Sequence, residues 1–459
     1  MTASTSHPHA RKPEPLEFDK PRVSIAKPEY RFDMQGEMPE PERVERAMKS
    51  FVKDFGRTAA IYMESCIHCG MCAEACHFYE VTKDPKYTPI WKLEPFKQAY
   101  KREYGPFAAI YRALNLKPKV TVEQLQEWQQ LIYDSCTVCG RCSLMCPMGI
   151  DIASLVSQAR HGMYNAGLIP HELWAVTERA RLEGSPLGAT PKVFKDRLEW
   201  LADDHEVDIP LDKPNAEVLC AMSSIEIMKY PDSVVATARI MNHLGVDWTF
   251  RLDGYEATNF GLLSGNSAAQ KLLTMKIIDA AVACGAKTVI LPECGHAYTA
   301  LRWMGANMYG QPLPFRVMHI AEFLAEQVRE GTLRLKKVAR SVTFHDPCQV
   351  VRRGGAIEAP REVLKALGVE LREMYPSKGT AWCCGGGGGV VANHRADELR
   401  YKTFRIKMEQ IEQTGAELPV TTCANCRQTF DDGQAHFKWD VKMHSLLELV
   451  ADNLIEDEA

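Results

Sequence analysis

Eight of the sixteen cysteines lie in two short runs of identical spacing, and these runs constrain the chain more than any other feature. Each run has the form C-x2-C-x2-C-x3-C; one spans residues 66–76, and the other spans residues 136–146 and is followed by proline. Three thiolates on one tight loop can face three irons of a cubic cluster, whereas the fourth, displaced onto the following helix, points the other way. The spacing therefore predicts two [4Fe–4S] clusters that share ligands crosswise.

The crossed assignment gives each cluster three cysteines from its own run and the fourth from the other run. One cluster is assigned Cys66, Cys69, Cys72 and Cys146. The other is assigned Cys136, Cys139, Cys142 and Cys76. The alternatives are two zinc knuckles or eight unligated thiols, but zinc sites usually pair two CxxC units and do not place four cysteines in one run. His77 departs from the pattern, because the second run has proline at the corresponding position.

A third group of five cysteines follows a different pattern near the C-terminal end: Cys348, Cys383, Cys384, Cys423 and Cys426. The adjacent pair could close only a strained disulfide ring, and its side chains diverge enough to reach two irons. Five thiolates exceed the four that a cube needs, which indicates an unusual or substrate-linked cluster. Glycines 385–389 would let the main chain wrap closely around an inorganic body. The alternatives are a flexible turn or a phosphate loop, but no Lys-Ser/Thr follows the glycines.

The C-terminal half of the chain contains an internal repeat with an offset of 123 to 129 residues. The aligned landmarks are segments 244–246 and 367–369, 259–261 and 383–385, 318–322 and 443–447, and the pairs Cys220/Cys348 and Cys294/Cys423. Each copy alternates short Val/Ile-rich strands with amphipathic helices, which is typical of an open α/β layer. Ligands of such layers bind beyond the carboxyl ends of the strands, where the aligned cysteines are expected.

The first copy of the repeat is degenerate. Asn259 and Phe260 replace the adjacent cysteine pair, and Ala297 stands where Cys426 would be by spacing. Only Cys220 and Cys294 remain, and two thiolates are too few for a four-iron cluster.

These patterns predict a multidomain chain of the α+β / α/β class. Residues 1–40 are expected to form a disordered arm, because they are rich in proline and charge. The expected parts that follow are a helical two-cluster ferredoxin-type domain (41–170), a connector (171–213), the degenerate α/β repeat (214–335) and the complete α/β repeat (336–459). Helices are expected over 41–55, ending at Gly56, and near 192–203 in the connector, and Thr121 with Gln124 predicts a capping box.

Charge and hydropathy argue against two classes of protein. Lys and Arg number 55 and Asp and Glu number 59, so the net charge of −4 lacks the basic excess of a nucleic-acid-binding protein. No apolar stretch is long enough to cross a membrane, and the start of the chain does not have the pattern of a secretory signal. Sixteen cysteines are too few for a disulfide scaffold in 459 residues. A cytoplasmic protein with metal-bound cysteines is expected.

The five C-terminal cysteines resemble the cysteine-rich CCG module of heterodisulfide-reductase-type proteins. Because two ferredoxin motifs precede this module in one chain, the pattern is similar to the fused catalytic subunits of that superfamily. It is most similar to the cytoplasmic DsrK-type subunits of the DsrMKJOP membrane complexes of dissimilatory sulfur metabolism, which have one degenerate module. The resemblance covers residues from about 60 to 455 and makes the two copies of the repeat tandem CCG repeats.

The resemblance implies a special, non-cubane or otherwise unusual [4Fe–4S] cluster held by the CCG cysteines, which would be the catalytic residues. It also implies thiol/disulfide oxidoreductase chemistry and a quinone-reactive cytochrome b partner at the inner face of the cytoplasmic membrane. Electrons would pass through the two cubane clusters to the CCG cluster, which reduces or forms a disulfide. The substrate would be a small thiol/disulfide protein, DsrC-like, or a low-molecular-weight disulfide.

The alternative function is electron transfer alone. The chain would then be similar to the iron–sulfur subunits of flavin-dependent glycolate or glycerol-3-phosphate dehydrogenases and would deliver electrons to quinone. Two histidines are secondary candidates. His345, close to Cys348, is a candidate for tuning the cluster or delivering protons, and His296 could be an acid/base or a packing residue.

Overall fold

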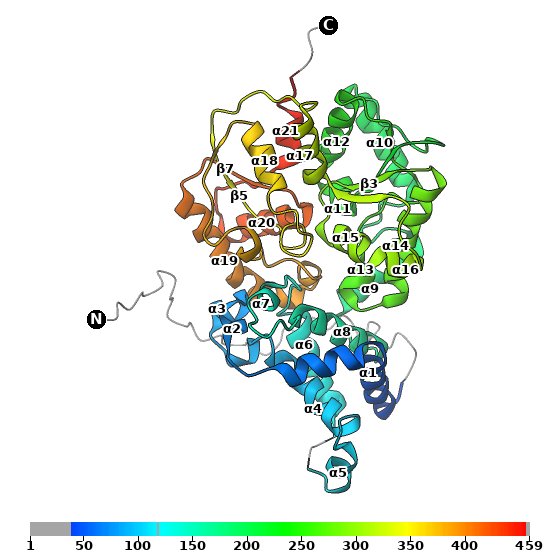
Figure 1. Ribbon diagram of the computed structural model, residues 1–459, viewed down its shortest axis with the longest axis vertical. Coiled ribbons are helices and arrows are strands. Elements are labelled where there is room, and N and C mark those ends of the chain that lie inside the picture. The colour runs from blue at the N-terminus through cyan, green and yellow to red at the C-terminus, as the bar shows by residue number, and fades with distance from the viewer. Residues whose placement is uncertain (1–37, 117–118, 456–459) are drawn as a thin grey trace, which may run out of the picture.

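The computed structural model describes residues 38–116 and 119–455. A helical part, coloured blue to cyan in Figure 1, lies at one end of the molecule, and two α/β layers lie side by side at the other end. The predicted disordered arm lies almost entirely outside the described residues. In the described part of the chain, no helix is both long and apolar enough to cross a membrane.

The first helix, α1 (Glu40–Ser65), continues past Gly56, where the sequence predicts its end. A glycine inside a helix costs about 1 kcal/mol relative to alanine. Ala59 and Met63 lie beyond it and are buried, so the helix keeps an apolar side facing the core after the glycine. The prediction of a helix ending at residue 55 was therefore wrong, because tertiary packing outweighs one unfavourable residue.

Helix α1 packs along α8 (Ile152–Asn165), the helix that follows the second cysteine run. The two helices approach closely at Gly162, where a Cβ atom would lie 2.7 Å from the carbonyl oxygen of Ala47. The α8 helix begins at Asp151, whose carboxylate accepts a hydrogen bond from the Ser154 N–H at 3.1 Å. Helix α8 also contacts the short helix of the second cysteine run, Arg141–Leu144.

The insert between the cysteine runs is helical. It contains α4 (Glu94–Glu103), α5 (Ala108–Ala113) and α6 (Val122–Tyr133). The predicted capping box is confirmed, because Thr121 Oγ1 accepts from the Gln124 N–H at 3.3 Å and Gln124 Oε1 accepts from the Thr121 N–H at 3.1 Å. Figure 1 shows α5 projecting from the end of the molecule opposite the α/β layers.

The connector holds two helices, α9 (His171–Glu183) and α10 (Pro191–His205), whereas the sequence predicts only the second. The buried residues of α9 are Leu173, Thr177 and Ala180, of which only one is large and apolar. A helix with so few apolar residues leaves little periodicity in the sequence. It is stabilised by packing against α13 (Phe260–Ser264) in the first α/β layer.

Each α/β layer contains a parallel sheet of four short strands. The strands are β1 (Val218–Cys220), β2 (Trp248–Thr249), β3 (Thr288–Leu291), β4 (Arg316–His319), β5 (Ser341–Phe344), β6 (Glu370–Leu371), β7 (Leu418–Thr421) and β8 (His444–Ser445). The strand orders β2-β1-β3-β4 and β6-β5-β7-β8 are the same, and every pairing is parallel. The two layers are therefore tandem copies of one α/β unit, as the internal repeat predicts.

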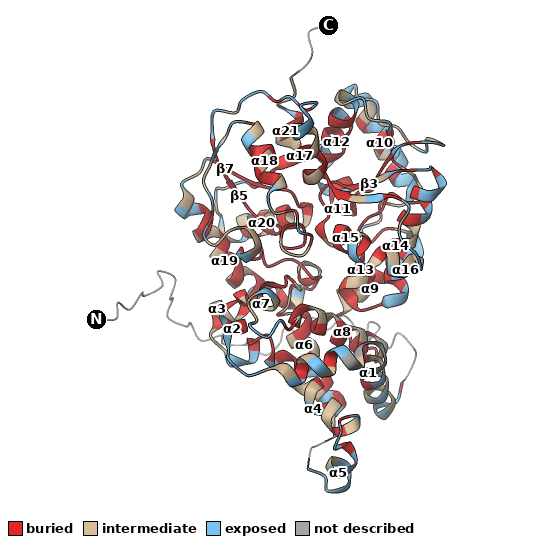
Figure 2. Ribbon diagram, in the orientation of Figure 1, coloured by how far each residue is buried: buried red, intermediate tan, exposed pale blue. Residues whose placement is uncertain are grey.

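The helices of the two copies enclose the sheets and share one apolar core. The first copy contains α11 (Ser224–Lys229), α12 (Asp232–His243), α13, α14 (Ser267–Ala283), α15 (Gly295–Thr299), α16 (Gly305–Tyr309) and α17 (Ile320–Glu330). The second copy contains α18 (Ala359–Ala366), α19 (Asp397–Thr414), α20 (Ala424–Phe437) and α21 (Leu446–Ala451). Figure 2 shows that the central strands and the facing sides of these helices are mostly buried, and β1, β5 and β7 are buried along their whole length. Side chains of both sheets belong to the same hydrophobic cluster, so the copies pack as one body.

The sheet register corrects two landmarks of the repeat. Cys220 pairs with Ile290 in the first sheet, and Phe344 pairs with Val420 in the second, so Cys220 is equivalent to Phe344. Cys348 follows Phe344 by four residues and lies beyond the strand, so Cys220 is not its counterpart. The sequence alignment matched Cys220 with Cys348 because each lies near the end of a strand. This match was wrong, because the strand pairing shows that the two cysteines occupy different positions in the register.

The same shift affects the last strand of each copy. His319 pairs with Leu291 and Ser445 pairs with Thr421, so His319 is equivalent to Ser445 and not to His444. Both residues are helix N-caps: His319 Nδ1 accepts from the Ala321 N–H at 3.2 Å, and Ser445 Oγ accepts a backbone N–H of α21. His319 therefore has a structural role.

One buried guanidinium, that of Arg160 on α8, joins the helical part to both α/β copies. Its nitrogens donate to four main-chain carbonyls: those of Ile132 (2.9 Å), Cys136 (2.7 Å), Leu263 (2.8 Å) and Gly388 (2.6 Å). These acceptors belong to the helical part, the first copy and the second copy. A buried charge is tolerated when its donors are satisfied, and carbonyl oxygens satisfy this one.

Replacing Arg160 by methionine should therefore destabilise the whole chain. The substitution leaves four buried carbonyls without this donor, and each unsatisfied group costs about 1–3 kcal/mol, so a loss on the order of 3 kcal/mol or more is expected. Anaerobic urea unfolding followed by circular dichroism measures the loss. The control is Arg316→Met, which removes an exposed ion pair with Glu326 and should cost less than about 1 kcal/mol. Equal losses for the two variants would contradict this role of Arg160.

Candidate metal centres

The two cysteine runs fold into loops with the same backbone conformation. Two residues after the first cysteine of each run, His68 and Val138 have positive φ values of 54° and 53°. The glycines after the second cysteines, Gly70 and Gly140, have φ values of 80° and 76°. A positive φ is strained for a β-branched residue such as valine, and such strain concentrates at functional sites. Each loop leads into a one-turn helix, α2 (Met71–Glu74) or α7 (Arg141–Leu144).

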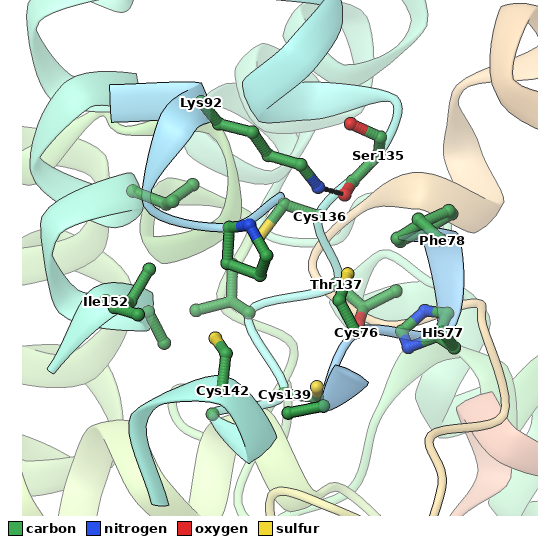
Figure 3. Close-up of a pocket in the computed structure, with 16 residues that line it drawn as sticks. Cys76, His77, Phe78, Lys92, Ser135, Cys136, Thr137, Cys139, Cys142 and Ile152 are labelled. Carbon is green, nitrogen blue, oxygen red and sulfur yellow. Dashed lines mark hydrogen bonds between the residues drawn. The ribbon is translucent and has the colours of Figure 1, made fainter. Parts of the chain in front are cut away.

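Four cysteines from both runs line one cavity beside α8. They are Cys76, Cys136, Cys139 and Cys142, here called the middle set. Figure 3 shows their sulfur atoms arranged around this cavity, and apolar side chains such as Ile152 complete its wall. Cys76 comes from the first run and joins three cysteines of the second run, as a crossed ligand set requires. Burial raises the pKa of Cys142 well above its usual value, and the nearby thiols raise it further.

The remaining four cysteines of the runs, Cys66, Cys69, Cys72 and Cys146, form the outer set. Burial raises the pKa of Cys72, and the proximity of Cys66, Cys146 and Cys69 raises it further. The set thus combines three residues of the first run with the last residue of the second. Cys69 is exposed, whereas Cys139 in the middle set is buried. The outer set therefore lies nearer the molecular surface.

The five cysteines of the second α/β copy, here called the CCG set, are all buried and belong to one cluster of side chains: Cys348, Cys383, Cys384, Cys423 and Cys426. The sulfurs of Cys348 and Cys383 are 4.0 Å apart. Cys423 is the N-cap of α20, and Cys426 lies in the first turn of that helix. The Gly385 N–H donates to the Cys383 sulfur at 3.4 Å. The structure therefore brings together residues that are up to 78 positions apart.

The chemistry of this donor set fits a metal cluster. A hydrogen bond with Cys383, together with burial, raises the pKa of Cys348 well above its usual value. Hydrogen bonds with Cys384 and Cys423 likewise raise the pKa of Cys426. Five buried thiols at this spacing cannot all ionise by themselves, because their negative charges would repel one another in a poorly solvated site. Bound iron would supply the positive charge that lets all five act as thiolate ligands.

The glycines after Cys384 are required by close packing. A Cβ atom on Gly386 would lie 1.9 Å from Thr429 Oγ1, and one on Gly388 would lie 2.7 Å from the backbone of Thr137. The segment therefore packs closely between α20 and the second cysteine run. Of the possibilities left by the sequence, a flexible turn is wrong, because the segment is buried and tightly packed.

The CCG set is in direct contact with the middle set. The Cys383 thiol donates to Thr137 Oγ1 at 3.4 Å, and a hydrogen bond between Cys139 and Cys383 raises the pKa of Cys139. The Gln349 side chain donates to the Val138 carbonyl at 3.0 Å, which ties the same two loops together. The proximity of Cys72 also raises the pKa of Cys142 and so links the outer and middle sets. The three thiol sets therefore form one series: outer, middle and CCG.

Two cations lie close to the middle and CCG sets: Lys407, which is buried, and Arg352, which is partly buried. Burial lowers the pKa of Lys407 to about 8, and its amine donates to Gln410 Oε1 at 2.8 Å. The Arg352 guanidinium donates to the Cys139 carbonyl at 3.0 Å and to the Gly379 carbonyl. Neither residue was identified from the sequence, because an isolated lysine or arginine on a helix or loop usually lies at the surface. Their charges offset the negative charge of clustered thiolates.

Three histidines lie close to the thiol sets. His77 is buried beside Cys139, with which it shares a hydrogen bond, so the departure from the usual proline places an imidazole at the middle set. His345 is fully buried beside Cys384 and Cys426. His296 Nε2 accepts from the Gly388 N–H at 3.4 Å, and burial lowers its pKa to about 4. His296 is therefore neutral near pH 7 and supports the glycine segment.

The corresponding pocket of the first α/β copy contains carboxylates in place of thiols. Glu226 accepts from the Ser223 N–H and hydroxyl and from the Glu293 N–H, and burial, with Glu293 nearby, raises its pKa to about 8. Glu293 is buried against Arg427 of the second copy, 3.3 Å away. Burial and Glu226 raise the pKa of Cys294 well above its usual value, and Asn259 and Phe260 stand where the second copy has its cysteine pair. These residues do not fit an iron–sulfur cluster.

Asn259 also has a structural role in the first copy. Its amide nitrogen donates to the Gln270 carbonyl at 3.1 Å and to Thr274 Oγ1 at 2.9 Å, and its oxygen caps α13 by accepting from the Leu262 N–H. An asparagine thus holds the loop where the second copy has its cysteine pair.

Comparisons with known proteins agree with these sets. A family model described as a 4Fe-4S dicluster domain matches residues 62–150, and one described as a cysteine-rich domain (CCG) matches residues 342–431. The chain is 28% identical to a dihydromethanophenazine:CoB–CoM heterodisulfide reductase subunit of Methanosarcina mazei, over 85% of this chain and 94% of that one. It is 27% identical to an Hdr-like menaquinol oxidoreductase iron-sulfur subunit 2 of Archaeoglobus fulgidus, over 89% and 82%.

A third relative has a different kind of name. The chain is 28% identical to an EtfAB:quinone oxidoreductase of Syntrophomonas wolfei, over 83% of this chain and 56% of that protein. Together the fold, the cysteine sets and these relatives define an iron–sulfur oxidoreductase subunit. The chain is a heterodisulfide-reductase-type iron–sulfur protein with a CCG domain.

The crossed ligand sets can be tested with single substitutions. Cys76→Ser should disturb the cluster held by Cys136, Cys139 and Cys142 and leave the cluster of its own run largely intact, because Cys76 lines the cavity of the other run. The matched variant Cys146→Ser should disturb the outer cluster instead. Electron paramagnetic resonance of the two reduced variants measures which signal is lost. Damage from Cys76→Ser that is confined to the outer cluster would show that the sets do not cross.

The role of the buried lysine can be tested by potentiometry. Lys407→Met should lower the reduction potential of the CCG cluster, because a positive charge nearby favours the state that carries the added electron. The expected change is about 40 mV or more, equivalent to about 1 kcal/mol for one charge in a protein interior. The control is Lys402→Met on the same helix, since Lys402 pairs with Glu398 near the surface. An unchanged potential in Lys407→Met would exclude this electrostatic role.

Proposed function

We propose that this chain transfers electrons from a membrane quinol or cytochrome b partner, through the outer and middle sets, to the CCG set, where a disulfide is reduced. The sets would hold two cubane [4Fe–4S] clusters and one special [4Fe–4S] cluster that carry single electrons and bind substrate sulfur. The observation that carries the proposal is the contact between Cys139 and Cys383, which brings the middle set against the CCG set. The balanced reaction takes one disulfide, two electrons and two protons to two thiols, and the reverse reaction forms the disulfide.

Residues of this chain would hold the clusters and keep them apart at fixed distances. The five CCG thiolates would be the catalytic residues, because they hold the group that meets substrate sulfur. Thr137, Gln349 and Arg352 fix the second cysteine run against the CCG set and keep the two centres at a constant separation. Burial of Cys139 and of all five CCG cysteines would exclude water and thiol oxidants from the point where electrons cross. Lys407 offsets the negative charge at the CCG set.

The relatives support a quinol-linked partner and a disulfide substrate. Their names include a CoB–CoM heterodisulfide reductase subunit and a menaquinol oxidoreductase subunit. We propose that a cytochrome b subunit donates electrons, and that the substrate is a small thiol/disulfide protein, DsrC-like, or a low-molecular-weight disulfide. A place in a DsrK-type complex of sulfur metabolism, at the inner face of the cytoplasmic membrane, follows as part of the same proposal.

The surface around the outer set is suited to a protein partner that delivers electrons. Cys69 is exposed, and Ile67 and Met71 beside it are 62% and 43% exposed. Leu144 and Met148, next to Cys146, are also exposed. Exposed apolar side chains gathered at a redox centre are typical of a docking site, since the partner must approach closely and exclude water. The electron donor would therefore bind at the outer set.

The second candidate is electron transfer between a flavoprotein and quinone. It is favoured by the relatives named EtfAB:quinone oxidoreductase and iron-sulfur-binding oxidoreductase FadF. The chain would then be the iron–sulfur subunit of a flavin-dependent dehydrogenase and would leave disulfides unchanged. Purification of the native complex distinguishes the two, because the first requires a cytochrome b and a thiol partner, and the second requires a flavoprotein.

The proposed site of disulfide chemistry can be tested with variants in both α/β copies. Anaerobically reconstituted chain should contain about twelve irons, from three four-iron clusters. Cys384→Ser should lower this to about eight and reduce disulfide-linked turnover at least about 100-fold, while both cubane clusters remain reducible by dithionite. Cys294→Ala and Cys220→Ala are the controls in the first copy and should keep most of the turnover.

Two outcomes would contradict the proposal. One is loss of turnover in a folded Cys294→Ala or Cys220→Ala variant as complete as in Cys384→Ser, because the first copy would then be catalytic. The other is a reproducible content of about sixteen irons, which would mean that the first copy also holds a four-iron cluster.

A further inference from the structure

One histidine close to the CCG set has no partner that explains its burial. His345 follows strand β5, and its backbone is held in the second sheet: its N–H donates to the Val420 carbonyl at 2.8 Å, and its carbonyl accepts from Thr421 Oγ1 at 3.1 Å. The side chain is fully buried, and neither ring nitrogen has a hydrogen-bond partner. An imidazole left this way loses its hydration without compensation, at a cost of about 1–3 kcal/mol for each unsatisfied group.

The orientation of this imidazole is set by its neighbour. Asp346 is held by partners of its own: its two carboxylate oxygens accept from Arg361 at 2.8 and 3.0 Å, and one also accepts from the Lys378 N–H. The ring of Phe430 packs edge-on against the imidazole, with an interplanar angle of 65° and centroids 5.2 Å apart. The backbone, the carboxylate next to it and the aromatic ring therefore fix His345 on the side of the cysteines.

The atoms that His345 faces are sulfurs of the CCG set. One of its ring nitrogens, the Cys384 sulfur and the Cys426 sulfur all lie within 4.8 Å of one another, and all three residues are buried. Two ligands of one tetrahedral metal, bound through nitrogen and sulfur, are about 3.6 Å apart, so this spacing fits a shared metal centre. No hydrogen bond joins the imidazole directly to either thiol, so an atom between them is needed to satisfy it.

The first α/β copy provides an internal comparison. The residue after β1 that corresponds to His345 in the sheet register is Ala221. The copy that lacks the adjacent cysteine pair therefore also lacks this histidine. His319, the other buried histidine at the end of a strand, has its Nδ1 bonded to a backbone N–H and caps a helix. His345 therefore does not have a structural role like that of His319.

We propose that His345 is a sixth ligand of the CCG cluster and binds one iron through a ring nitrogen, beside Cys384 and Cys426. The ligand set would then be five thiolates and one imidazole. The inference rests on the proposed function only in that it requires the CCG set to hold an iron–sulfur cluster. An imidazole ligand is neutral where a thiolate is negative, and histidine ligands raise the potential of other iron–sulfur centres, so the CCG cluster would accept an electron more readily than one with a thiolate at this position.

The test is pulsed electron paramagnetic resonance of the full chain labelled with 15N-histidine and reconstituted anaerobically. In a paramagnetic state of the CCG cluster, a strong 15N coupling of the size typical of a coordinated imidazole is expected. The coupling should be absent from His345→Gln and unchanged in His319→Gln, which removes a buried histidine of the other copy. The wild-type measurement does not depend on a variant folding, and His345→Cys offers a second ligand at the same position if His345→Gln loses its cluster.

The outcomes separate this inference from the function on which it rests. About twelve irons in the wild type with no 15N coupling, or with only the weak coupling of a hydrogen-bonded imidazole, would overturn the histidine ligand and leave the proposed function standing. A wild type with only about eight irons would show that the CCG set holds no cluster and would overturn both. A strong coupling that persists in His345→Gln would assign the ligand to another histidine and also overturn the inference.

Discussion

The arrangement of the whole chain depends on one buried charge. Arg160 donates to carbonyls of the helical part, of the first α/β copy and of the glycine segment in the second copy. Because its donors are fixed in a plane, the guanidinium holds three segments that are distant in sequence at a defined relative position. Two of its acceptors, the carbonyls of Cys136 and Gly388, belong to the middle set and to the glycine segment of the CCG set. The same interaction therefore stabilises the fold and sets the separation of the redox centres.

Electrostatics also explains why the thiol sets lie where they do. Thirteen cysteines are gathered in three adjoining groups, and twelve of the thirteen are at least partly buried. Unligated, such groups are costly to ionise, and the pKa of Cys142, raised chiefly by burial, expresses that cost. Lys407 and Arg352 reduce it at the junction, and iron would remove most of it. Assembly of the clusters and stability of the interior are thus coupled.

The two α/β copies show how one fold supports different interiors. Both have the same strand order, and in each a residue after the third strand begins a helix at the pocket: Cys294 in the first copy and Cys423 in the second. In the first copy, however, carboxylates and Asn259 fill the pocket with internal hydrogen bonds. Glu293 of that copy meets Arg427 of the other, so the degenerate pocket has become part of the interface. A fold does not fix function; the residues at the strand ends decide it.

The sequence by itself determined what depends on local spacing: two four-cysteine runs, the CCG pattern, the alternation of strands and helices, and their duplication. The sheet register was decided only in three dimensions, because Cys220 and Cys348 each lie near a strand end and the chain alone cannot distinguish neighbouring alignments. Helix α9 and the last turns of α1 also escaped prediction, since packing rather than periodicity stabilises them. The contact of Cys139 with Cys383, the burial of Lys407 and the unpaired imidazole of His345 bring together residues up to 244 positions apart. Such proximity follows from the packing of whole layers, which no local pattern encodes.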